Sequence, residues 1–135
     1  MISYYIKLYL ATFIAFFVID IIWLGLVARR FYDKHLGFLL TDKPLWSAAI
    51  VFYLLFVAGV LILIVLPGIN QFSTRRLILH GALFGLVAYG TYDLTNLALV
   101  KGWPWIVTVV DMFWGAALAA ITSYIGLLLA RYLGQ

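Results

Sequence analysis

Four long apolar runs constrain the fold of this chain more than any other feature. They cover about residues 4–28, 46–66, 77–100 and 104–131. Each run is long enough to cross a hydrocarbon layer of ~30 Å, which takes roughly 20 helical residues. Because the apolar residues are continuous rather than alternating, helices are favoured over the strands of a membrane barrel. The sequence predicts an all-α membrane protein: one transmembrane domain over residues 1–135, with four helices in a compact bundle.

Composition agrees with a place in the membrane. Only 10% of the residues are charged and the mean hydropathy is +1.12, whereas soluble domains carry roughly 25% charged residues. The formal charge of +4 is dispersed, so no nucleic-acid partner is expected. The absence of cysteine excludes a disulfide framework or a thiolate metal site. The first run continues through Trp23 and Leu26 without a cleavage pattern, so it is interpreted as a span rather than a signal peptide.

The longest break between runs has helical character of its own. Phe31, Leu36 and Leu40 recur at helical spacing, with charged residues on the other side. This pattern predicts a short helix lying in the membrane interface, and a soluble loop is the alternative. Four residues of this segment are candidates for contact with lipid headgroups, although such side chains also anchor helix ends by snorkelling. They are Arg29, Arg30, Lys34 and His35.

Two further patterns concern packing. Small residues recur every four positions in the third and fourth runs, at Gly81, Gly85, Gly115, Ala119 and Ser123. This spacing lets helix backbones approach closely and predicts a tight pair of helices. The second run has Tyr53 as its only ionisable residue and is interpreted as a lipid-facing wall.

The basic residues do not decide the orientation in the membrane. Four lie on the side of the termini, and five lie on the side of the first and third connections. They are Lys7, Arg75, Arg76 and Arg131 against Arg29, Arg30, Lys34, Lys43 and Lys101. The positive-inside rule therefore leaves both orientations open.

Three of the five acidic residues fall inside the apolar runs: Asp20, Asp93 and Asp111. At a rise of ~1.5 Å per residue, each lies roughly 10–12 Å from the end of its helix. Because the chain alternates direction, these three ends are on the same side of the membrane. An unpaired carboxylate at the centre of a bilayer costs at least about 2.5–3.5 kcal/mol, so such residues normally face the bundle interior. The sequence predicts that the three carboxyls converge in one polar pocket.

Neighbouring residues extend this pocket. Tyr89, Asp93 and Asn96 share one helix face, because they stand at positions i, i+4 and i+7. The pattern D-x-x-W occurs twice, with a tryptophan one turn after Asp20 and one turn after Asp111. The residues expected to line the pocket beside the carboxyls are Trp23, Tyr89, Tyr92, Asn96, Thr108 and Trp114.

The chemistry of the pocket is left open by these residues. The carboxyls are candidate acid, base or ligand groups, or else they join helices by hydrogen bonds alone. Their oxygens are ligands that Mg²⁺ accepts, but no histidine accompanies them and no metal site is predicted. The chain contains none of the common hydrolase, nucleotide-binding or metalloprotease motifs. No cofactor can be named, and enzymatic activity stays undecided.

Three segments of the chain resemble a family of small, predicted bacterial membrane proteins known only as a domain of unknown function. The segments are DIIWLG (20–25), YDLTNLAL (92–99) followed by KGWP, and DMFWG (111–115). The resemblance covers essentially the whole chain. It implies a four-span protein of the bacterial inner membrane, and it implies no catalytic residue.

The location of the pocket favours one functional hypothesis over two others. A pocket at the depth between acyl chains and headgroups, beside a cationic connection, favours a lipid-modifying or lipid-binding protein whose partner is a membrane lipid. A small proton-coupled transporter acting as a homodimer also fits four short spans with an intramembrane aspartate. The third hypothesis is an accessory subunit packed against a larger membrane protein.

Overall fold

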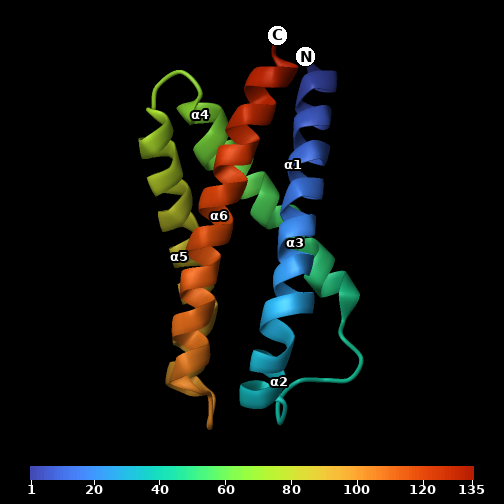
Figure 1. Cartoon of the computed structure of the whole chain (residues 1–135), viewed down its shortest axis with the longest axis vertical. Coiled ribbons are helices and arrows are strands. Elements are labelled where there is room, and N and C mark those ends of the chain that lie inside the picture. Colours follow the sequence, from blue (N-terminus) through green and yellow to red (C-terminus); the bar gives the residue numbers. More distant parts are fainter.

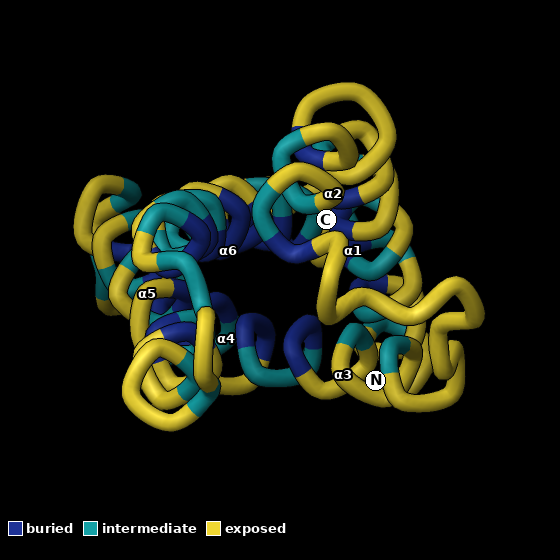
Figure 2. The backbone as a smooth tube through the Cα atoms, turned by 90° about the horizontal axis from the view of Figure 1, so that it is seen from below, coloured by how far each residue is buried: buried dark blue, intermediate teal, exposed yellow.

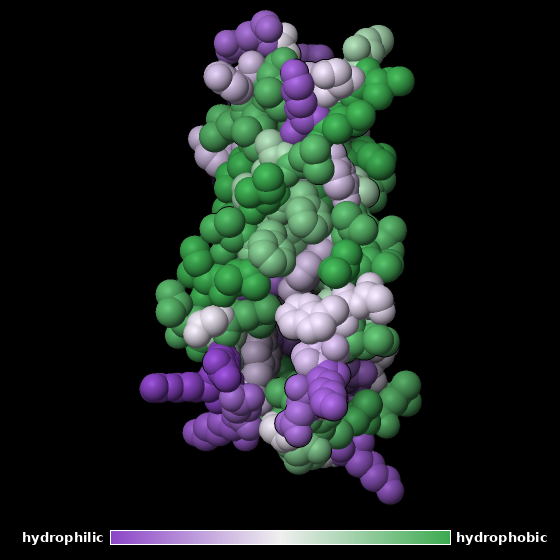
Figure 3. All heavy atoms as spheres, turned by 90° about the vertical axis from the view of Figure 1, so that its right-hand side faces the viewer, coloured by the Kyte–Doolittle hydropathy of each residue, from purple (hydrophilic) through white to green (hydrophobic).

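The computed structural model describes residues 1–135, of which 84% are helical, and contains no strand. Four helices are long and apolar enough to cross a membrane: Ile2–Leu36, Trp46–Gly68, Thr74–Leu99 and Trp105–Leu133. The predicted all-α fold with four spanning helices packed together is therefore confirmed. Figure 3 shows the corresponding surface, a broad hydrophobic band between two hydrophilic ends.

The first span is longer than the sequence predicts. It consists of α1 (Ile2–Ile22), a π-helical segment η1 (Trp23–Ala28) and α2 (Arg29–Leu36). The backbone stays helical through the junctions, because no proline interrupts residues 2–36. The short helix expected at the interface therefore exists as α2, but it continues the first span instead of forming a separate element.

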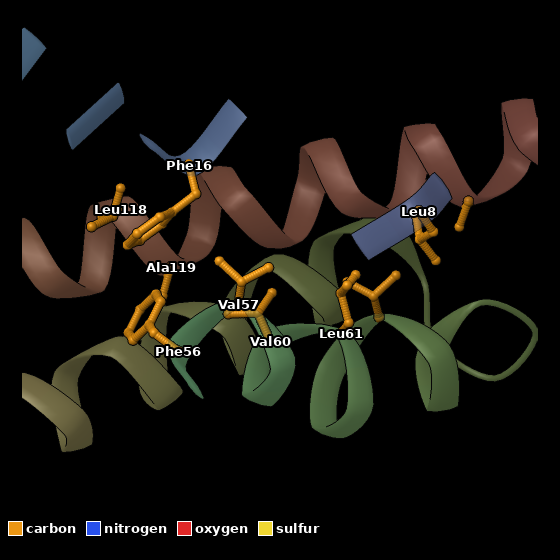
Figure 4. Packing of buried hydrophobic residues seen from close by; sticks show 10 residues of the cluster. Leu8, Phe16, Phe56, Val57, Val60, Leu61, Leu118 and Ala119 are labelled. Carbon is orange, nitrogen blue, oxygen red and sulfur yellow. The ribbon is translucent and has the colours of Figure 1, made fainter. Parts of the chain in front are cut away.

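The second span crosses the bundle obliquely (Figure 1). It comprises α3 (Trp46–Gly59), a second π-helical segment η2 (Val60–Val65) and the short α4 (Leu66–Gly68). From Phe56 onward one face of this span is buried, including Val57, Val60 and Val65. Figure 4 shows Val57 and Val60 among side chains of α1 and α6. The interpretation of the second span as a lipid-facing wall is wrong for this face, because uniform hydropathy does not reveal which side of a helix packs inward.

Helices α5 (Thr74–Leu99) and α6 (Trp105–Leu133) form the tight pair that the small residues predict. A Cβ atom at Gly85 would collide with the backbone oxygen of Gly115, and one at Gly81 would collide with the side chain of Ser123. Gly102, with a φ of +77°, makes the turn between the two helices. The predicted close approach of the third and fourth spans is confirmed.

The bundle has two different ends. The termini and the connection at residues 69–73 lie at one end, here called the terminal end. The connections at residues 37–45 and 100–104 lie at the other, the connection end (Figure 1). Seen from the connection end, buried residues face the inside of the bundle and exposed residues form its outer surface (Figure 2).

Candidate functional site

Asp111 lies on the inner side of α6, six residues after the helix begins at Trp105. That spacing places it about 9 Å inside the helix end. The residue is 7% exposed. The hydroxyl of Tyr32 in α2 donates a hydrogen bond to its Oδ1 atom. The continuation of the first span into α2 is what brings this hydroxyl to the carboxyl.

Asp93 on α5 forms a pair with Asp111. Its side chain is fully buried, and neither of its oxygens accepts a hydrogen bond from an N–H or O–H group of the protein. The carboxyl of Asp111 on α6 is its acidic neighbour. Two carboxyls side by side repel each other when both are ionised.

The backbone of α5 at Asp93 is fixed to α6 and to the turn. The Thr108 hydroxyl donates to the backbone oxygen of Asp93 at 3.1 Å. The indole N–H of Trp103 donates to the Thr108 oxygen, also at 3.1 Å. Thr108 was expected to line the pocket, but it lies between the two helices and positions Asp93 from behind.

Asp20 on α1 is 5% exposed and accepts hydrogen bonds on both oxygens. The Tyr53 hydroxyl of α3 donates to Oδ2 at 2.7 Å, and the Trp114 indole of α6 donates to Oδ1 at 3.4 Å. This carboxyl therefore joins three spans.

Trp23 and Trp114 stack face to face, with ring centroids 4.3 Å apart and planes 8° from parallel. The indole N–H of Trp23 lies next to the Tyr32 hydroxyl, but it is not aligned for a hydrogen bond. The stack thus connects the neighbourhood of Asp20 with that of Tyr32. The two tryptophans expected as pocket walls lie together at the centre of the site.

Tyr89 on α5 is part of the cavity wall, four residues before Asp93. Its ring occupies the space beside Gly115, where a Cβ atom would collide with it. The ring therefore lies between α5 and α6, the helices that carry Asp93 and Asp111. No group of three or more acidic or histidine side chains is arranged to hold a metal ion.

A cavity of about 350 Å³ opens beside this network. Its lining residues come from α2, α3, α5 and α6, and they are Tyr32, Phe52, Ala88, Tyr89, Tyr92 and Asp111. Asp111 is the one carboxyl in the wall, whereas Asp93 and Asp20 lie behind it. Phe52 and Tyr92 are 42% and 57% exposed, so the cavity is bordered by side chains on the outer surface of the bundle.

The other predicted residues lie outside the cavity wall. Asn96 stands one turn after Tyr92 on α5. Arg29, Arg30 and Lys34 of α2 are exposed. His35 packs against the Phe31 ring, with centroids 4.7 Å apart. The structure therefore does not bring the basic residues of α2 to the carboxyls.

Four residues of the site were missed by reasoning from the sequence: Tyr32, Phe52, Tyr53 and Trp103. Two of these residues have a distinguishing feature. Tyr53 is the single ionisable residue of an otherwise apolar span, and Tyr32 stands four residues from both Ala28 and Leu36, which are buried. Nothing in the sequence distinguishes Phe52 or Trp103 from the other aromatic residues of the chain.

The chain belongs to the family described as "Predicted membrane protein (DUF2177)", whose model matches residues 5–128. This membership confirms the resemblance seen in the sequence and establishes a multi-pass membrane protein. Searches among curated proteins and among solved structures found no significant match.

Proposed function

We propose that the protein binds a membrane lipid by drawing the polar headgroup into the cavity at Asp111, as a lipid-binding or lipid-modifying protein of the bacterial inner membrane. The observation that carries the proposal is the composition of the cavity wall. One carboxyl, three phenols and two apolar side chains surround a space of about 350 Å³. Binding sites for small molecules are of this size and are mostly apolar, with a few polar groups that orient the ligand.

The depth of the cavity suits an amphiphile. Asp93 lies six residues before the end of α5 and Asp111 six residues after the start of α6, so both are about 9 Å inside the helix ends. A headgroup drawn to this depth leaves its acyl chains in the hydrocarbon layer. The exposed rings of Phe52 and Tyr92 provide a border over which the lipid enters from the side of the bundle.

The residues take different roles in this proposal. Asp111 contacts the headgroup, and Asp93 is the acid or base behind it. Tyr32 positions Asp111 through its hydrogen bond. Asp20, with Tyr53 and Trp114, fixes the three spans around the cavity. The exposed basic residues of α2 contact lipid phosphates at the membrane surface.

A small proton-coupled transporter acting as a dimer is the second candidate, and the neighbouring carboxyls of Asp93 and Asp111 are the observation that favours it. Against it stands a layer of apolar side chains between the site and the terminal end. Phe16 and Phe56 are in contact, with ring centroids 5.2 Å apart, and Leu118 is fully buried with them. This layer separates the cavity from the terminal end, whereas transport needs access from both ends in turn and lipid binding needs access from one side only.

The proposal is tested by photolabelling in vesicles. The probe is a phospholipid with a diazirine on the acyl chain next to the glycerol, and the labelled peptides are identified by mass spectrometry. We expect label to concentrate around Phe52 and Tyr92, in excess of that around Phe113, which is 75% exposed on α6. Equal labelling around the bundle would overturn the proposal, and would leave an accessory subunit as the simpler function.

A cavity-filling pair of variants controls this experiment. Ala88→Phe places a ring inside the cavity, because Ala88 is part of its wall, and should remove the excess label. Ala117→Phe adds the same ring on the exposed side of α6 and should leave the labelling pattern unchanged.

A further inference from the structure

We propose that the ligand group taken up by this cavity is an organic ammonium, such as the amine of a zwitterionic lipid headgroup. The inference rests on the proposed function only in that the cavity is a ligand site. It adds the chemical class of the ligand, which neither the family nor the location of the site supplies.

The first argument is the aromatic wall. Four of the six lining residues carry aromatic rings, and they come from three different helices: Tyr32, Phe52, Tyr89 and Tyr92. Ammonium groups, quaternary ones included, are bound in proteins by aromatic cages, through the electron-rich faces of the rings. An anionic phosphate gains nothing comparable from these rings.

The second argument is the uncompensated charge. Asp111 accepts a hydrogen bond from Tyr32, and no lysine, arginine or histidine acts on it or on Asp20 and Asp93. When Asp111 is ionised, its charge therefore has no cationic partner within the protein. A buried charge is stabilised when it is paired with an opposite one. An ammonium beside Asp111 supplies the missing partner, whereas an anionic headgroup would be repelled.

The third argument is the position of the second carboxyl. Asp93 is fully buried, and neither of its oxygens has a hydrogen-bond partner in the protein. It lies outside the cavity wall and leaves the cavity free for a ligand. A primary ammonium has three N–H donors, and its donors and charge both match Asp111 in the wall.

The same chemistry is offered by two sources, a lipid headgroup within the bilayer and a water-soluble ammonium ion. The experiment separates them by native mass spectrometry of the detergent-released protein. In one arm the protein is equilibrated with equal amounts of dioleoyl phosphatidylethanolamine and dioleoyl phosphatidylglycerol. In the other arm tetraethylammonium is added as competitor.

We expect phosphatidylethanolamine to be retained over phosphatidylglycerol by about tenfold, in line with the strength of a desolvated cation–π contact. Asp111→Asn should abolish this preference, while Asp33→Asn, on the exposed side of α2, should keep it. If Asp111→Asn does not fold, a second pair of variants tests the proposal. Phe52→Leu should weaken the preference several-fold, and Phe113→Leu, on the outer face of α6, should not.

The outcomes are distinct. Equal retention of the two lipids with no effect of tetraethylammonium overturns the ammonium inference and leaves lipid binding standing. Competition by tetraethylammonium without a lipid preference supports the ammonium inference and overturns the lipid as its source. Retention of neither lipid and no competition overturns both proposals.

Discussion

The two halves of the bundle are built from the same four spans but packed by different means. In the terminal half, side chains such as Leu8, Val60 and Val65 are buried against one another, and the close approach of η2 to α6 is made at Gly126. In the connection half, carboxyls, phenols and indoles face each other around a cavity. The groove in the terminal half, between α1 and the second span, is lined by hydrophobic residues alone, whereas the connection half is hydrogen-bonded and has a carboxyl in its cavity wall.

The difference shows how a membrane protein separates stability from binding. Lipid chains are as apolar as leucine, so hydrophobicity does not hold helices together in a bilayer, and close packing must do so. The terminal half supplies that packing. The connection half is thereby free to keep polar groups and empty space that would weaken a bundle relying on them. We expect packing variants to change stability and site variants to change binding.

The largest effect is expected at the boundary of the two halves. Gly85→Ala would push its Cβ against the backbone of Gly115, and overpacking of this kind costs about 1–3 kcal/mol or more. The free energy of unfolding, measured by dodecyl sulfate titration in mixed micelles, should fall by about 3 kcal/mol. Gly25→Ala is the matched control, because nothing lies within 4 Å of its added Cβ. Equal losses for the two variants would contradict the close approach of α5 and α6.

The next effect is expected from a cavity made in the apolar layer. Phe16 is fully buried and Phe17, its neighbour in sequence, is 42% exposed. Phe16→Ala should lower the unfolding free energy by about 2 kcal/mol, below the 3–5 kcal/mol typical of soluble cores, because the transfer from water is missing. Phe17→Ala should cost much less. If the two truncations lowered the free energy of unfolding equally in the same titration, the contrast between the two halves would be wrong.

A smaller effect is expected from a single hydrogen bond of the connection half. Tyr53→Phe removes the donor to Asp20. Hydrogen bonds between membrane helices average about 0.6 kcal/mol, so stability should fall by roughly that amount. A double-mutant cycle with Asp20→Asn isolates the pair. A coupling near 3 kcal/mol would mean that the carboxyl network, rather than packing, holds the bundle together.

The smallest change in stability is expected at Asp93. Asp93→Asn keeps the shape of the side chain and replaces a carboxyl whose oxygens have no hydrogen-bond partner in the protein, so the free energy of unfolding should change by less than about 0.5 kcal/mol. Retention of phosphatidylethanolamine should nevertheless fall several-fold, because the carboxyl pair is lost. Asp33→Asn is the control for both measurements. A variant that loses stability but keeps the lipid would identify Asp93 as a joint between helices only.

The sequence predicts the parts of this molecule that depend on composition and periodicity. The four spans follow from hydropathy, and the shared depth of Asp20, Asp93 and Asp111 follows from their distances to the helix ends. The small-residue spacing locates the approach of α5 and α6. These features are properties of single helices or of their regular repeat.

The parts that were missed depend on how the helices face each other. The sequence does not place Tyr53 at Asp20, because an apolar span has no polar face from which its rotation can be read. Tyr32 was assigned to a connection, since two arginines ordinarily mark the end of a span. Its contact with Asp111 depends on the helix continuing through η1, and no residue pattern marks a π-helical turn.

The π-helical segment η1 affects how members of the family can differ in length. A π-helical turn is equivalent to one extra residue inserted into an α-helix, and each residue turns an α-helix by about 100°. Because the π turn absorbs the extra residue, a relative with one residue fewer between Trp23 and Ala28 would carry an unbroken α-helix and would still turn the phenol of α2 toward Asp111. A codon gained or lost elsewhere between Asp20 and Tyr32 would rotate α2 by about 100° and exchange the phenol for a neighbouring side chain. A change of length at this one position would therefore leave the group that faces the carboxyl unchanged.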